Sequence, residues 1–131
     1  LTNPGSCLAT AAAITAVGRY TNTANVKGKA SSICFDGQAE INGFTTVLPP
    51  NAPACIDIAN GNADGTGVLA PPNSYHTGGV HCLMVDGAVR FVNNSINTGN
   101  LGVGTSLGAP SPYGVWGALG TRNGKEPVSN F

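Results

Sequence analysis

Hydrophobic and polar positions near the N-terminus follow the spacing of a helix. Ser6 is placed to cap it, the apolar run extends over residues 7–17, and Gly18 is placed to end it. One face carries mainly small residues, namely Leu8, Ala11, Ala12 and Thr15, with Ile14 beside it. A face of this kind predicts close packing, either on a sheet of the same domain or on a neighbouring subunit.

The next part of the chain reads as loops and short strands. Residues 20–30 are polar and predict a solvated loop. Short strands are expected at residues 32–35 and 43–48. The proline-rich run at 49–53 then excludes ladder pairing and predicts an extended, irregular segment.

The clearest local pattern lies between residues 79 and 93. Two β-prone runs are separated there by Asp86 and Gly87, which predicts a hairpin with a two-residue type I′ turn and positive φ at both central positions. Apolar residues occur on both faces of the first run. The hairpin is therefore expected at the centre of its sheet rather than at an edge.

Residues 113–120 contain the single tryptophan of the chain. A short helical turn there would press Trp116 and Leu119 onto the sheet as a C-terminal anchor.

A polar loop spans residues 57–67. Asn60, Asn62 and Asp64, followed by Gly65, have the spacing that opens a calcium loop. The twelfth position is Pro71 rather than a glutamate, so an ordinary turn is the default interpretation. No cofactor is expected, and calcium is the one candidate metal.

Composition limits the classes of function. The 131 residues fit one domain, 1–131, and only 9% are charged, with a formal net charge of zero. There is no basic field to hold nucleic acid, and no apolar run of 18 residues to span a bilayer. Weak self-repulsion favours association with further copies of the chain. Since the sequence begins at Leu1 without a leader, an export segment is expected to have been removed or to lie further upstream.

Four cysteines are spread along the chain without CxxC spacing. They favour two disulfides in an exported protein over a zinc site or four reduced thiols. All three connectivities stay open on spacing alone. The four residues are Cys7, Cys34, Cys55 and Cys82.

Candidate catalytic chemistry is sparse. The candidates for a catalytic or metal-binding group are His76, Asp86 and the nearby Ser74. The turn explains Asp86, and an imidazole bonded to backbone would fix the loop that contains His76. His81 is expected to pack or to contact another subunit. We therefore expect no enzyme, with a hydrolase that uses His76 as the alternative.

Several motifs, taken in order, resemble a planctomycete family of prepilin-type proteins. The strongest is a histidine, nine residues and Asp-Gly, formed here by His76, Asp86 and Gly87, with Gly78 and Gly79 between them. Similar segments occur at residues 35–37, 43–55, 95–100 and 115–122. The resemblance covers the chain from about Cys7 to its C-terminus.

The resemblance implies an α+β pilin-like head, with an N-terminal helix packed on an antiparallel sheet and long loops tied by disulfides. It implies a structural subunit of a bacterial extracellular filament or surface assembly, polymerised with its own copies. The hydrophobic stem of the family is absent, for which cleavage, a separate chain that supplies the stem, and a different mode of assembly are the candidate explanations. Cys34 and Cys82 depart from the family pattern together, which suggests that they pair and that Cys7 pairs with Cys55. The alternative is a minor pseudopilin or adhesin-like module that binds polysaccharide or an exported substrate.

Overall fold

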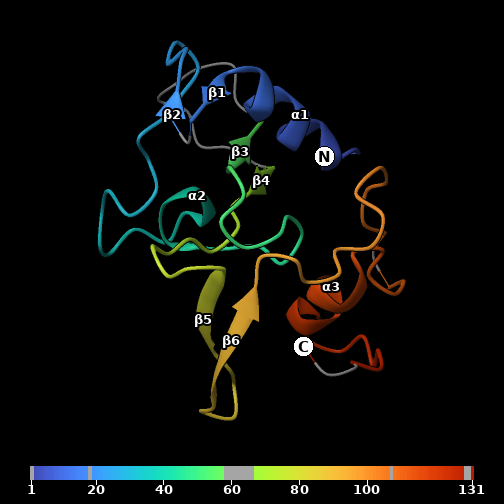
Figure 1. Cartoon of the computed structure of the whole chain (residues 1–131). Helices are drawn as coiled ribbons and strands as arrows, with labels where there is room; N and C mark the ends of the chain where they lie inside the picture. The colour runs from blue at the N-terminus through green and yellow to red at the C-terminus, as the bar shows by residue number, and fades with distance from the viewer. Residues whose placement is uncertain (1, 18, 58–66, 107, 129–130) are drawn as a thin grey trace.

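A computed structural model describes residues 2–17, 19–57, 67–106, 108–128 and 131 and has a small α+β fold. Within this part of the chain the strands form two-stranded antiparallel ribbons, which are β1 (Thr15–Ala16) with β2 (Arg19–Tyr20), β3 (Cys55–Ile56) with β4 (Val68–Leu69), and β5 (Gly79–Leu83) with β6 (Val89–Asn93). The helices are α1 (Gly5–Ala13), α2 (Ala39–Asn42) and α3 (Gly114–Gly120). Figure 1 shows β5 and β6 projecting from the end of the molecule opposite α1.

Helix α1 is shorter than expected and is capped differently. Pro4 occupies the N-cap position, and the hydroxyl of Ser6 donates to the carbonyl of Asn3 (2.7 Å) instead of capping the helix. The helix ends at Ala13 because the chain turns back on itself there. Thr21 donates its amide to the carbonyl of Ile14 (2.7 Å), and Thr15 pairs with β2. Gly18 lies outside the described residues.

The prediction of a strand at residues 32–35 is wrong. This segment is a loop whose backbone carbonyls bind the side chain of Asn42, the last residue of α2. The Asn42 amide donates to the carbonyls of Ile33 (2.8 Å) and Asp36 (2.6 Å). A side chain thus satisfies the backbone groups that a neighbouring strand would otherwise have to satisfy.

The strand expected at residues 43–48 does not form either, although this segment runs beside β4. Thr45 binds Ala70, the residue after β4: its amide donates to the carbonyl of Ala70 (2.7 Å) and its hydroxyl accepts the Ala70 amide (3.1 Å). The proline-rich segment that follows is irregular, as expected. Leu48, just before it, is completely buried.

Buried side chains form two clusters. The first contains Cys7, Leu48 and Leu69, and the second contains Val80, Val92 and Trp116. The indole Nε1 of Trp116 donates to the carbonyl of Leu48 (2.8 Å) and so joins the two clusters.

The prediction of one antiparallel sheet that packs under the N-terminal helix is therefore wrong, although the α+β class is as expected. Helix α1 contributes Cys7 to a cluster that includes Leu69 of β4, whereas the β5–β6 hairpin packs against Trp116 of α3. Figure 1 shows α3 beside the hairpin and α1 above β3 and β4. No described helix has the length and apolar composition needed to cross a membrane.

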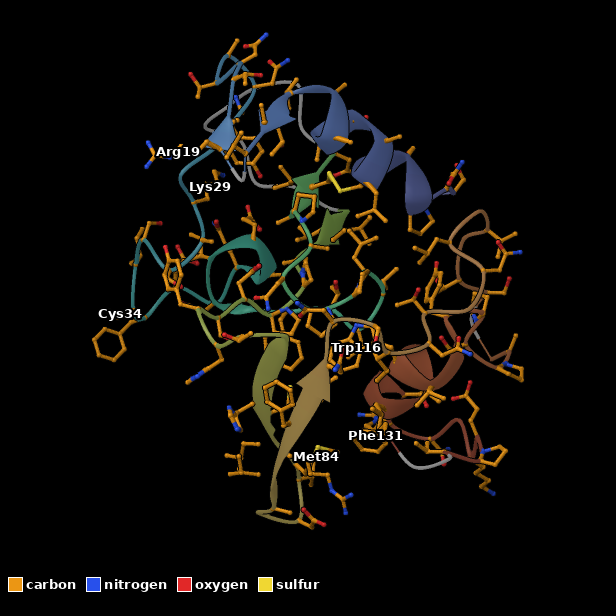
Figure 2. The ribbon with its side chains drawn as sticks, in the orientation of Figure 1. Arg19, Lys29, Cys34, Met84, Trp116 and Phe131 are labelled. Atoms are coloured by element: carbon orange, nitrogen blue, oxygen red, sulfur yellow. A yellow bond between two sulfur atoms is a disulfide. The ribbon has the colours of Figure 1, made fainter. Side chains whose placement is uncertain are left out.

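One of the two expected disulfides is present. Cys7 of α1 is bonded to Cys55 of β3, with Cα atoms 5.9 Å apart, which ties the N-terminal helix to residues 48 positions away. The expected bond between Cys34 and Cys82 is absent, and both carry free thiols. Cys34 lies exposed on an outlying loop (Figure 2), whereas Cys82 packs beside the cluster around Trp116. The two thiols thus belong to different surroundings.

Candidate functional site: the β5–β6 hairpin

The two strands of the hairpin pair as expected, but the turn that connects them is of a different type. Leu83 pairs with Val89, and the loop between them closes with the amide of Gly87 donating to the carbonyl of Met84 (3.0 Å). Gly87 has positive φ (86°), while Asp86 does not share that conformation. The loop therefore has the three-residue pattern of a turn followed by a left-handed glycine, instead of the expected two-residue type I′ turn. The Asp86 carboxylate accepts the Ala88 amide (2.9 Å), a local turn contact.

Polar contacts hold the base of the hairpin. Asn51 adopts positive φ (62°), and its side-chain oxygen accepts the amide of Ser74 (2.7 Å). Its amide group donates to the side-chain oxygen of Asn94 (2.9 Å), just after β6. The hydroxyl of Ser74 donates to the carbonyl of Gly79 (2.8 Å). The loop before β5 and both strands are thus fixed to one asparagine.

Glycine is needed at Gly78 and at Gly79 for different structural reasons. Gly78 has positive φ (84°), a conformation that side chains disfavour. Gly79 has no space for a side chain, because a Cβ there would meet the Phe91 ring at 2.7 Å and the carbonyl oxygen of Val92 closer still. Glycine at this position lets the Phe91 ring lie over the strand.

The inner face of the hairpin is covered. Val80 and Val92 are buried against Trp116, and Leu119 packs at the margin of this cluster. The structure therefore places both residues of the expected C-terminal anchor on the hairpin. Cys82 also lies on this face, and partial burial raises the pKa of its thiol.

The outer face of the hairpin is apolar and uncovered. The register places His81 and Leu83 on it, opposite Phe91 and Val89 of β6. Leu83 is 74% exposed, Val89 is 64% exposed and Phe91 is 41% exposed. The hairpin forms a sheet of its own with two strands, so neither strand lies at the centre of a sheet, contrary to expectation. One face is buried by α3, and the other is exposed.

The structure does not bring His76 and Asp86 together as a catalytic or metal-binding pair. The ring of His76 lies against that of His81, with centroids 5.1 Å apart, whereas the carboxylate of Asp86 is bound to its own turn. Ser74 directs its hydroxyl at the carbonyl of Gly79 and accepts the amide of His76 (3.2 Å). The hydroxyl of Ser74 therefore holds this loop, and the expected bond from the His76 imidazole to backbone is not found among the described residues.

The calcium candidates Asn60, Asn62 and Asp64 lie outside the described residues. Among the residues that are described, no three His, Cys, Asp or Glu side chains gather in a group that would hold a metal ion.

A shallow groove of about 410 Å³ runs along α1. Ala11 and Ala12 of the small-residue face line it, together with Tyr20 and the side chains of Asn51 and Asn73. The close packing expected of this alanine face is therefore incomplete in the single chain.

Sequence reasoning missed the exposed outer face. The signal was present in the alternation, since residues 81, 83, 89 and 91 share the face opposite Val80 and Val92. Sequence alone did not show that the hairpin would have a helix on one side and nothing on the other.

These features define a small, disulfide-bonded α+β domain with a projecting apolar hairpin and no cluster of three or more metal-ligating side chains among the described residues. The model of the family described as "Protein of unknown function (DUF1559)" matches residues 2–99, well over half of the chain. The chain belongs to this family. No curated protein and no solved structure matches it.

Proposed function

We propose that this chain is a non-enzymatic structural subunit of an extracellular, pilin-like or pseudopilin-like filament or surface assembly of bacteria, and that it associates with its own copies. The uncovered outer face of the β5–β6 hairpin carries the proposal. Its aliphatic and aromatic side chains are exposed together on a rigid, braced element, and contiguous apolar surface of this kind marks interaction sites.

Strand pairing adds to the argument. Both strands of the hairpin have an edge without a neighbour in their sheet. Unpaired edges accept a further strand from another chain, and the hairpin has neither the lysines nor the prolines that usually protect such edges. The low charge of the chain leaves little repulsion between copies.

An extracellular location is supported by the Cys7–Cys55 bond, because disulfides persist in oxidising compartments. Membership of the family is consistent with the prepilin-type relationship expected from the ordered motifs. Under this proposal the domain is the head of a subunit, and a hydrophobic stem would come from another segment or chain.

Electron microscopy of the purified protein tests the proposal. Ordered polymers are expected for the wild type, and Leu83→Lys should abolish them because it places a charge on the apolar outer face. Asn25→Lys adds the same charge at an exposed site on the loop after β2 and should polymerise normally. Monomers at all concentrations, or equal polymerisation of both variants, would contradict the assignment.

The groove along α1 favours a second candidate, a module that binds polysaccharide or an exported substrate. Its volume lies within the range of roughly 300–1,000 Å³ that is usual for ligand sites, and Tyr20 offers an aromatic ring to a sugar. Glycan binding that is lost in Tyr20→Ala, by a protein that stays monomeric, would favour this module over the structural subunit.

A further inference from the structure

The two histidines of the chain lie together on the hairpin. His76 comes from the loop before β5 and His81 from the middle of that strand. Their ring centroids are 5.1 Å apart, with planes at 82°. The His81 ring also packs on Phe91, at 5.0 Å between centroids. Two residues that are separate in sequence thus present their imidazoles at one place on the outer face.

Both imidazoles are available to a ligand. Among the described residues, neither ring donates or accepts a hydrogen bond, and both side chains are exposed. Their backbone is nevertheless fixed, since the His76 amide donates to Ser74 and His81 lies within the paired strand. A preorganised pair loses little conformational entropy when it binds an ion.

The separation of the rings suits one tetrahedral ion. Zinc binds an imidazole nitrogen at about 2.0–2.1 Å with ligands at roughly tetrahedral angles, which sets two ring centroids about 5 Å apart. The observed separation of 5.1 Å agrees with this value. Imidazole nitrogen is a ligand that zinc, copper and nickel favour over calcium or magnesium.

Nearby charges do not oppose a cation there. The cation of the hairpin, Arg90, lies on the opposite face of the ribbon, with its guanidinium over the Phe131 ring at 5.5 Å. Cys82 also points to that inner face. The pair on the outer face is therefore made of two imidazoles beside apolar side chains.

Two histidine ligands fill only two of the four coordination positions of a tetrahedral ion. No group of three or more ligating side chains occurs among the described residues, so the missing positions are not supplied from within this part of the chain. The side chains next to the pair, Leu83, Val89 and Phe91, are uncovered and apolar. A second copy facing the first across a two-fold axis would supply the same two histidines and would bury these side chains.

We propose that His76 and His81 bind a zinc-type divalent cation whose remaining two positions are filled by the same two histidines of a second copy. This inference rests on the proposed self-association and names the chemistry of one of its contacts. The ion links two hairpins, and the apolar side chains around it close the contact.

The test uses the full chain with Cys34→Ser, so that the exposed thiol does not bind the metal. Calorimetric titration with zinc should give one ion per two chains, and analytical ultracentrifugation should show zinc converting monomers into dimers and larger assemblies and EDTA reversing it. Loss of one histidine of a chelating pair should weaken binding by about 10²-fold. His76→Ala and His81→Gln are therefore both expected to stay monomeric with zinc, while circular dichroism shows them folded. Asn73→Ala, a polar change three residues before His76, should behave as the parent.

No zinc binding, or one ion per chain without a change in mass, would overturn the inference. Polymers that form equally well in EDTA and in both histidine variants would also overturn it, yet would leave the structural-subunit proposal standing. Zinc-dependent dimers without any polymer would support the metal contact and would count against the proposed filament or lattice.

Discussion

Replacing Trp116 by phenylalanine should test how the two halves of the core are joined. The indole is 2% exposed, and its Nε1 donates to the carbonyl of Leu48, which belongs to the other cluster and is completely buried. Phenylalanine keeps an aromatic ring against Val80 and Val92 but removes the donor. The Leu48 carbonyl then has neither its partner nor water.

The expected loss of free energy of unfolding has two parts, the unpaired carbonyl and the lost apolar surface. A buried carbonyl left without a donor costs about 1–3 kcal/mol. The smaller ring removes apolar surface equivalent to about two methylene groups, or roughly 2 kcal/mol. The free energy of unfolding should therefore fall by about 3–5 kcal/mol, a large part of the 5–15 kcal/mol that is typical of a domain. In urea the midpoint should fall by about 2 M.

Tyr113→Phe is the matched control. Tyr113 is buried, and its hydroxyl donates to the carbonyl of Val103 (3.0 Å). Val103 is 41% exposed, so water can replace the lost donor and the cost should stay near 1 kcal/mol. Unfolding is followed by far-ultraviolet circular dichroism, because Trp116→Phe removes the single tryptophan as a fluorescence probe. If the two variants lose the same free energy, the hydrogen bond does not join the clusters as argued.

Four further predictions concern the cysteines and the base of the hairpin. Cys7→Ala opens a link across 48 residues and should lower the free energy of unfolding by about 4 kcal/mol, whereas Cys34→Ala should change it by less than about 0.5 kcal/mol in the same urea titration. Gly79→Ala should destabilise the domain by about 1–3 kcal/mol through its clash with β6, and Gly28→Ala, which meets nothing within 4 Å, should not; a similar thermal midpoint for both would refute the close approach. Iodoacetamide should modify Cys34 at least about tenfold faster than Cys82, measured by mass spectrometry, because burial and a raised pKa keep the latter a protonated thiol. The folded state favours the protonated thiol of Cys82, so its contribution to the free energy of unfolding is fully present below the ordinary thiol pKa. That contribution is lost as the pH rises through the raised pKa of the folded state. Cys82→Ala should therefore reduce any loss of stability at alkaline pH.

The sequence by itself determined the local elements that depend on residues close together in the chain. Alternating β-prone runs around Asp86 and Gly87 were enough to predict the hairpin, because pairing and turning depend on neighbours within about fifteen residues. A single tryptophan near the C-terminus was enough to suggest an anchor. Membership of the family likewise needs only the sequence, since the family model matches residues 2–99.

Tertiary structure decided everything that depends on which distant group reaches a backbone atom or a ring. The side chain of Asn42 binds the carbonyls of Ile33, Cys34 and Asp36, so that the expected strand is a loop. Packing by α3 buries one face of the hairpin and leaves the other open, which no periodicity specifies. Cys34 and Cys82 stay apart, whereas His76 and His81 meet, because the fold of the loops sets the separation of these side chains and the kind of residue does not.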